Sequence, residues 1–224
     1  KHSTEMQNEF LELGNRIPIL KIGIPPMFST IFFPEVINAF ELHHPDIQIE
    51  LDEFGSVRAC NLVQEEKLGL AIVNMEQFNI DKFESRVLAK EQLVYVVSKN
   101  HPMSGKKYMT IEDFKDEKLV MFNVDSVQNE LLKNRFDGLN ISPHIIMRSS
   151  QLYTTLKFVD KGNCGCFLFS DMLPHFREYV GIPLKPSIDV KIGIIWKKEK
   201  FLSHSAQLFI DFAMQYCSEK IITP

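Results

Sequence analysis

Near the start of the chain, two short apolar segments enclose an amphipathic one. Residues 19–24 and 47–51 are rich in β-branched and other apolar side chains, which predicts two strands. Apolar residues recur at helical spacing within residues 31–40 and form a single stripe. The order strand–helix–strand predicts a crossover connection and therefore a parallel sheet.

The ends of this predicted helix carry local signals. Pro34 is expected in the first turn of the helix, where a backbone N–H would have no acceptor within the helix, so that its absence costs nothing. Ser29 and Thr30 are expected as N-cap residues. Pro45 cannot continue the helix and disfavours helical backbone at His44. In an open α/β sheet, ligands bind where strands end and helices begin. We therefore expect a small-molecule site after the first strand.

Strand and helix patterns alternate along the rest of the chain. Further strands are predicted at 68–73, 93–97, 119–123, 144–147, 166–169 and 190–196, and further helices at 57–67, 128–136, 151–161 and 206–217. Ser56 is expected to cap the helix at 57–67, and Thr110–Asp113 reads as a capping box. The pattern indicates two α/β units in series, with the last helix returning to the first unit.

Composition narrows the class of protein. The 224 residues are 45% hydrophobic and 24% charged, enough for one large domain or two small ones. The net charge of −4 argues against a nucleic-acid surface on this part of the protein. No apolar run reaches the length of a bilayer span, and no signal-peptide pattern opens the chain. Because the first residue is Lys, we expect a piece of a longer protein.

Candidate chemistry is sparse. The seven histidines show no metal-ligand spacing, and no nucleophile elbow, phosphate loop or dinucleotide-binding turn is present. We expect no metal, no cofactor and no enzymatic activity. The four cysteines form no C-x-x-C pair, which favours reduced thiols and a cytoplasmic location. Cys164 and Cys166 would share one face of a strand, so a redox role is an alternative to simple burial.

Several short motifs occur together in a fixed order. They are Leu20-Lys-Ile-Gly23, Phe33-Pro34, Leu70-Ala-Ile-Val73, His101-Pro102, and Gly162 with Gly165 before a strand. In this order, the chain from 17 to 215 resembles the effector-binding domain of LysR-type transcriptional regulators. Residues 23–27 and 32–34 are similar to the CidR-type branch of that family. The late glycine motif departs from the family pattern by one extra residue and by ending in Ser170.

The resemblance implies an α/β, periplasmic-binding-protein-like fold of type 2. Two Rossmann-like lobes would be joined by two crossover strands, with lobe I at 17–97 and 195–224 and lobe II at 98–194. Residues 1–16 would be the remnant of a linker helix. The resemblance also implies an interlobe cleft for the effector, an upstream winged helix-turn-helix that alone contacts DNA, and assembly into dimers and tetramers.

The candidate effector site is built from strand-end segments of both lobes. Its members are Pro26, Met27, Phe28, Ser29, Thr30, Phe54, Gly55, Ser56, Asn123, Arg148, Ser149 and Ser150. Amide and hydroxyl groups at a helix start suit a carboxylate, and Arg148 can pair one in a bidentate way. The alternatives are that Ser29 and Ser56 are only caps, and that Arg148 forms a surface or interlobe salt bridge. Met27 and Phe28 are expected as walls.

The first helix carries more aromatic and aliphatic side chains than one buried stripe requires. Phe32, Phe33, Ile37 and Phe40 are therefore candidates for a dimer interface. In the alternative, all four lie inside their own lobe.

These observations predict the effector-sensing part of a bacterial LysR-type transcription factor, with a small carboxylate as effector and no membrane association. A solute-binding protein of an ABC-type transporter, which has the same two-lobed fold, is the alternative. An enzyme on this fold would need a catalytic constellation that the sequence does not show.

Overall fold

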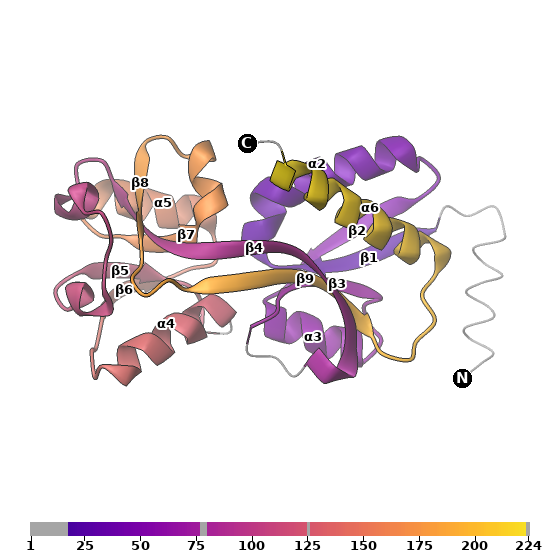
Figure 1. The fold of residues 1–224 in the computed structure, drawn as a ribbon, viewed down its shortest axis with the longest axis horizontal. Coiled ribbons are helices and arrows are strands. Elements are labelled where there is room, and N and C mark those ends of the chain that lie inside the picture. The colour runs from indigo at the N-terminus through magenta and orange to yellow at the C-terminus, as the bar shows by residue number, and fades with distance from the viewer. Residues whose placement is uncertain (1–17, 77–79, 125, 223–224) are drawn as a thin grey trace. The chain divides into compact units, whose positions relative to one another are not determined.

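The computed structural model describes residues 18–76, 80–124 and 126–222, with the backbone alone at 31–32, 80 and 219–222. The chain forms two compact units (Figure 1). Unit 1 comprises Lys1–Val73, Phe78–Ala89 and Gly193–Pro224, and unit 2 comprises Asn74–Gln77 and Lys90–Ile192. Strands β4 (Phe83–Ser98) and β9 (Asp189–Lys197) each contribute residues to both units, and the lobe boundaries after 97 and 194 stay a prediction. The predicted linker remnant, 1–16, lies outside the described residues.

Unit 1 is built on parallel strands. Strand β1 (Ile19–Ile24) pairs in parallel with β2 (Gln48–Glu53) on one side and with β3 (Leu70–Asn74) on the other. The next strand beside β3 is β9. The predicted crossover and parallel sheet are confirmed. Because β1 and β2 run parallel, their carboxyl ends lie side by side, with Ile24 opposite Glu53.

Among the described residues of unit 1, three helices cover the sheet. They are α2 (Pro26–His43), α3 (Ser56–Gln64) and α6 (His204–Ile222). In Figure 1, α2 and α6 lie on one side of the strands and α3 lies on the other. The ring of Phe40 meets those of Phe209 and Phe212 edge-on, with centroids 5.2 and 5.4 Å apart. The C-terminal helix therefore packs against the first helix of the chain.

This packing limits what α2 can offer to another subunit. Phe33 and Phe40 are completely buried in the single chain, so neither ring has surface left for a partner. Ile37 keeps intermediate exposure, and the side chain of Phe32 lies outside the described residues. A dimer interface on α2 stays a prediction. Of the three candidates whose side chains are described, only Ile37 keeps surface that a partner could contact.

Helix α2 begins earlier than the sequence pattern predicts. Its N-cap is Pro25 in extended conformation, followed by Pro26 in the first turn, and Pro34 lies inside the helix rather than at its start. Two consecutive prolines favour this start, because Pro26 keeps Pro25 out of helical backbone and itself needs no N–H partner. Ser29 and Thr30 are thus helical residues, and their expected role as N-caps is wrong. Ser56 is likewise the first residue of α3, behind Gly55 as N-cap.

Unit 2 contains antiparallel and parallel strand pairs. Strand β4 pairs antiparallel with β7 (Cys166–Phe169) and β8 (Tyr179–Pro183), whereas β5 (Lys118–Met121) and β6 (His144–Arg148) pair in parallel. Among the described residues its α-helices are α4 (Val127–Gly138) and α5 (Leu152–Lys161), and short 3-10 helices form at Pro102–Gly105, Ile111–Phe114 and Ser170–His175. The capping box at Thr110 is confirmed, although it opens a 3-10 turn. Strand β8 was not predicted, because its glycine and proline argue against a strand.

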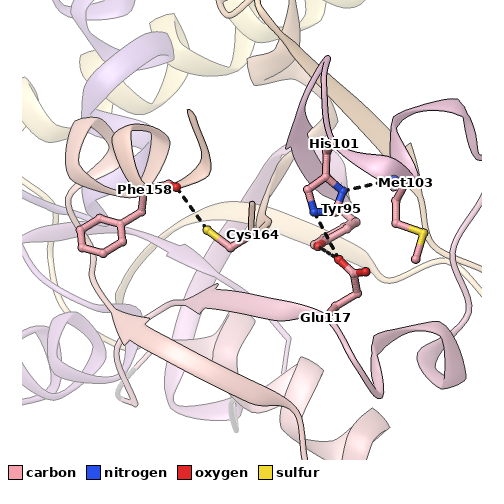
Figure 2. A network of polar contacts seen from close by, with 6 residues as sticks. All are labelled: Tyr95, His101, Met103, Glu117, Phe158 and Cys164. Atoms are coloured by element: carbon pink, nitrogen blue, oxygen red, sulfur yellow. Dashed lines mark hydrogen bonds and ion pairs between the residues drawn. The ribbon is translucent and has the colours of Figure 1, made fainter. Parts of the chain in front are cut away.

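A buried tyrosine organises the core of unit 2 (Figure 2). The ring of Tyr95 is completely buried, and its hydroxyl donates to Oε2 of Glu117 at 2.8 Å. The same oxygen lies 3.5 Å from Nε2 of buried His101, whose Nδ1 accepts the Met103 N–H at 3.2 Å. Because Nδ1 is an acceptor, neutral His101 carries its proton on Nε2, toward Glu117. Burial and then the bond to Glu117 raise the pKa of Tyr95, which keeps it a neutral donor.

The close approach of Gly165 to Tyr95 is testable. A Cβ at Gly165 would collide with the Tyr95 ring, whereas one at Gly138 meets nothing within 4 Å. We expect Gly165→Ala to lower the free energy of unfolding by about 1–3 kcal/mol, because overpacking forces the ring to move. Gly138→Ala, the matched control, should be neutral or slightly stabilising. Urea denaturation measures both; equal stabilities would contradict this account of the core.

Candidate functional site

In the first turns of α2, two backbone amides and two hydroxyls donate hydrogen bonds to carbonyl groups of the chain itself. Pro26 has no N–H, and the amides of Phe28 and Ser29 both donate to the Pro25 carbonyl, at 3.0 and 3.2 Å. The hydroxyls of Ser29 and Thr30 donate to the Pro26 carbonyl, at 2.7 and 3.0 Å. The sequence predicts an anion-binding segment here, but these four groups point their protons at the chain's own carbonyls. An anion-binding role for this segment stays a prediction.

A carboxylate of the chain itself lies at this turn. Glu53 ends β2, and its Oε1 is a second acceptor within hydrogen-bond reach of the single Ser29 hydroxyl proton, beside the Pro26 carbonyl. We call Pro26–Thr30 together with Glu53 the α2 rim. Glu53 is not among the site residues predicted from the sequence, although the sequence carries a signal for it. Ile47, Ile49 and Leu51 alternate as apolar residues, and Glu53 puts a charge at the next position of that series.

The next predicted segment, 54–56, follows directly on Glu53. The amide of Phe54 donates to the Ile24 carbonyl at 2.9 Å, which holds this segment beside the end of β1. Phe54 is half-buried, and the guanidinium of Arg58 lies 4.8 Å from its ring centroid. Ser56 is buried. Met27 and Phe28 are buried as well, consistent with their expected role as walls.

In unit 2 the structure brings the predicted residues together where β5 and β6 end. The Asn123 amide donates to the Ser150 hydroxyl at 3.3 Å, and the Ser149 amide donates to the Met121 carbonyl at 3.0 Å. The Ser149 hydroxyl in turn accepts the amide of Gln151, the N-cap of α5, at 3.0 Å. We call Asn123, Arg148, Ser149 and Ser150 the Arg148 rim. Parallel pairing of β5 with β6 produces it.

Arg148 is held by neutral groups. Its Nη1 donates to Oδ1 of Asn129 at 2.6 Å and to the Phe122 carbonyl at 3.3 Å. Asn129 is buried on α4 and was not predicted as part of the site. Among the described residues, no carboxylate lies within ion-pair distance of Arg148. The expected alternative, a salt bridge, is therefore not found in the described part of the chain, and the exposed guanidinium keeps an uncompensated charge.

Unit 2 also holds a partly buried carboxyl group, Glu91, beside Ser170 and Asp171. Burial raises the pKa of Glu91 to about 8, and the charge of Asp171 adds to the effect. Oε2 of Glu91 is buried, and it has no hydrogen-bond partner among the described residues. Glu91 therefore holds a proton near neutral pH.

This carboxyl group predicts a pH dependence of stability. Folded Glu91 keeps its proton up to about pH 8, whereas an unfolded Glu side chain loses it at about pH 4.3. Between these values the folded state binds the extra proton, so stability falls as pH rises, by at most about 1.4 kcal/mol per pH unit. Glu91→Gln should flatten this slope in urea denaturation from pH 5 to pH 9. Glu84→Gln, an exposed position on the same strand, should leave the slope unchanged; equal slopes in both variants would contradict the assignment.

All four cysteines are buried free thiols. Cys164 Sγ donates to the Phe158 carbonyl at 3.3 Å (Figure 2). Burial raises the pKa of Cys164 and of Cys166, and raises that of Cys60 to about 11. Because the thiolate is the reactive form, these environments disfavour redox chemistry.

We therefore expect the native thiols to react slowly with Ellman's reagent and with hydrogen peroxide, and all four to react after unfolding in urea. Lys133→Cys, at an exposed position on α4, provides a control thiol that should react at once. Rapid peroxide oxidation of Cys164 or Cys166 in the folded protein would restore the redox interpretation.

Other kinds of site receive no support from the described residues. Across residues 18–76, 80–124 and 126–222, no group of three or more His, Cys, Asp or Glu side chains is placed to hold a metal ion. Within the same ranges, no helix combines the length and apolarity that crossing a bilayer requires.

Comparison with known proteins places the chain among transcriptional regulators. A sequence model of the LysR substrate binding domain matches residues 16–218. The uncharacterized HTH-type transcriptional regulator YwbI of Bacillus subtilis is 27% identical over 201 residues, which cover 88% of this chain and 66% of YwbI. The chain thus spans about two thirds of that relative.

Solved structures agree in fold. The effector-binding domain of QuiR in complex with shikimate superimposes with a TM-score of 0.77 at 22% identity, covering 91% of this chain and 99% of that domain. The CcmR regulatory domain from Synechocystis in complex with 2-PG gives a TM-score of 0.81 at 18% identity, covering 89% and 97%. The periplasmic-binding-protein-like fold predicted from the sequence is confirmed.

Proposed function

The chain belongs to the LysR substrate binding domain family and is the effector-binding domain of a LysR-type transcriptional regulator, and we propose that its effector is a small carboxylate bound through Arg148. The solute-binding alternative is not favoured, because the relatives are transcriptional regulators. Placement near the CidR-type branch stays a prediction.

The proposal for the whole protein extends beyond this chain. The relatives are longer and are named HTH-type regulators, which supports a DNA-binding segment outside the chain and a cytoplasmic location. A dimeric or tetrameric assembly is a further part of this proposal. The effector would favour one conformation of the domain and so change the arrangement of the attached DNA-binding segments. In this role the domain performs no chemistry on its ligand.

One observation carries the carboxylate proposal. Among the described residues the Arg148 guanidinium has hydrogen bonds only from Nη1, and only to the neutral Asn129 and Phe122 groups. Those bonds fix the plane of the guanidinium and leave the edge formed by Nε and Nη2 for an acceptor. A carboxylate fits that edge with two parallel charge-assisted hydrogen bonds. Asn123 and Ser150 add amide and hydroxyl groups at the same strand ends.

This proposal predicts the effect of changing Arg148. A carboxylate that binds only the folded domain must raise its melting temperature, so acetate, pyruvate and larger carboxylates are screened beside their neutral amides. Arg148→Gln should weaken binding of the active carboxylate by about tenfold or more, and Arg148→Lys should restore part of it. Arg177→Gln, the same charge change at an exposed position of unit 2, is the matched control. Equal affinity in wild type and Arg148→Gln would overturn the assignment.

A further inference from the structure

Asn129 lies at a position of α4 that meets both the start of the helix and Arg148. Ser126 is the N-cap, and its hydroxyl accepts the Asn129 N–H at 3.1 Å, which makes Asn129 the third residue of the helix. In a capping box, the side chain at this position accepts the N–H of the N-cap residue. Here the Ser126 N–H donates to the Asn123 carbonyl at 3.1 Å. Oδ1 of Asn129 instead accepts from Nη1 of Arg148 at 2.6 Å.

A carboxylate at position 129 would suit these surroundings better than the amide does. Asp and Asn have the same shape, and a hydrogen bond from a guanidinium to a carboxylate is roughly twice as strong as one to a neutral acceptor. A negative charge in the first turn of a helix is also favourable, and α4 carries one at the next residue, Glu130. The side chain of Asn129 is buried, but the charge of Arg148 in direct contact would offset the cost of burying a carboxylate there.

The amide has one property that a carboxylate lacks, which is that it leaves the charge of Arg148 uncompensated. The two groups that accept from Arg148, the Asn129 amide oxygen and the Phe122 carbonyl, are both neutral. A carboxylate at 129 would form an ion pair with the guanidinium inside the chain, and that pair would compete with any anionic ligand. A neutral acceptor at this position therefore orients the cation and keeps it available.

We propose that Asn129 is a positioning residue, whose amide orients Arg148 toward an anionic ligand without neutralising it, although a carboxylate at this position would make the domain more stable. This inference rests on the proposed function, since Arg148 is the group assigned to the carboxylate of the effector. Its residues all belong to unit 2. Replacing the amide by a carboxylate should raise stability and reduce binding together, a combination that a purely structural residue would not produce.

A double-mutant cycle tests the contact without any ligand. Melting temperatures are measured for wild type, Asn129→Asp, Arg148→Gln and the double variant. Asn129→Asp should raise the melting temperature by about 2–4 °C in the wild-type background. It should lower the melting temperature in the Arg148→Gln background, because the buried carboxylate there has no counter-charge.

Asn134→Asp, the same charge change at an exposed position of α4, is the matched control and should have equal effects in both backgrounds. If Asn129→Asp also has equal effects in both, its carboxylate does not pair with Arg148, and the proposal is overturned.

Binding is measured by calorimetry with acetate, pyruvate and benzoate, each beside its neutral amide. Wild type should bind at least one carboxylate more tightly than the matching amide. Asn129→Asp should bind that carboxylate about tenfold or more weakly and should lose the preference for it over the amide. Asn129→Leu, which removes the acceptor but adds no charge, should bind the carboxylate more weakly than wild type and keep the preference. If Asn129→Asp does not fold, unchanged affinity in Asn129→Leu would still overturn the proposal.

The outcomes distinguish this inference from the proposed function. If wild type and Asn129→Asp bind the carboxylate equally well while Arg148→Gln does not, Asn129 does not control the charge of Arg148, and only this inference is overturned. If Asn129→Asp weakens the binding of carboxylate and amide alike, Asn129 has a structural role alone, and the inference is overturned in the same way. If no carboxylate binds wild type, or if Arg148→Gln binds it unchanged, the carboxylate proposal fails and this one fails with it.

Discussion

The hydrogen bond from buried Tyr95 to Glu117 is the constraint on which unit 2 depends. A phenol hydroxyl in a core needs an acceptor, and the half-buried Glu117 carboxylate provides it, with His101 as a second neighbour of the same oxygen. The ring also takes the space beside Gly165, so no side chain fits there. Packing of this ring thereby fixes how β4 meets the segment leading into β7.

A comparable local constraint governs unit 1. The consecutive residues Pro25 and Pro26 end β1 and start α2 without a gap, which turns an expected loop into the first turn of a helix. Donors that a loop would present to a ligand are then bonded to the carbonyls of those two prolines. The hydrogen bonding of the α2 rim therefore follows from where the helix starts.

The α2 rim and the Arg148 rim differ in the sign of the charged group that neutral partners hold in place. At the Arg148 rim a cation is oriented by the neutral Asn129 and Phe122 groups, which leaves its charge available to a ligand. At the α2 rim an anion is oriented by a serine hydroxyl, which leaves a negative charge available. Neutral partners position a charged group without neutralising it, and this favours ligands that carry a complementary charge.

The sequence by itself determined the fold class, because β-branched runs and amphipathic helical stripes are local patterns that a parallel α/β sheet requires. The order of the short motifs indicated the family. It also predicted that Arg148, Asn123 and Ser150 lie close together, since residues at the carboxyl ends of neighbouring parallel strands meet at one edge of the sheet. Only the tertiary structure decided the start of α2, the existence of β8 and the burial of Phe33 and Phe40, because each depends on packing against distant segments. The hydrogen-bond partners of Glu53 and Asn129 were also decided by the tertiary structure. A hydrogen-bond partner 24 or 19 residues away is set by the fold rather than by its neighbours in the chain.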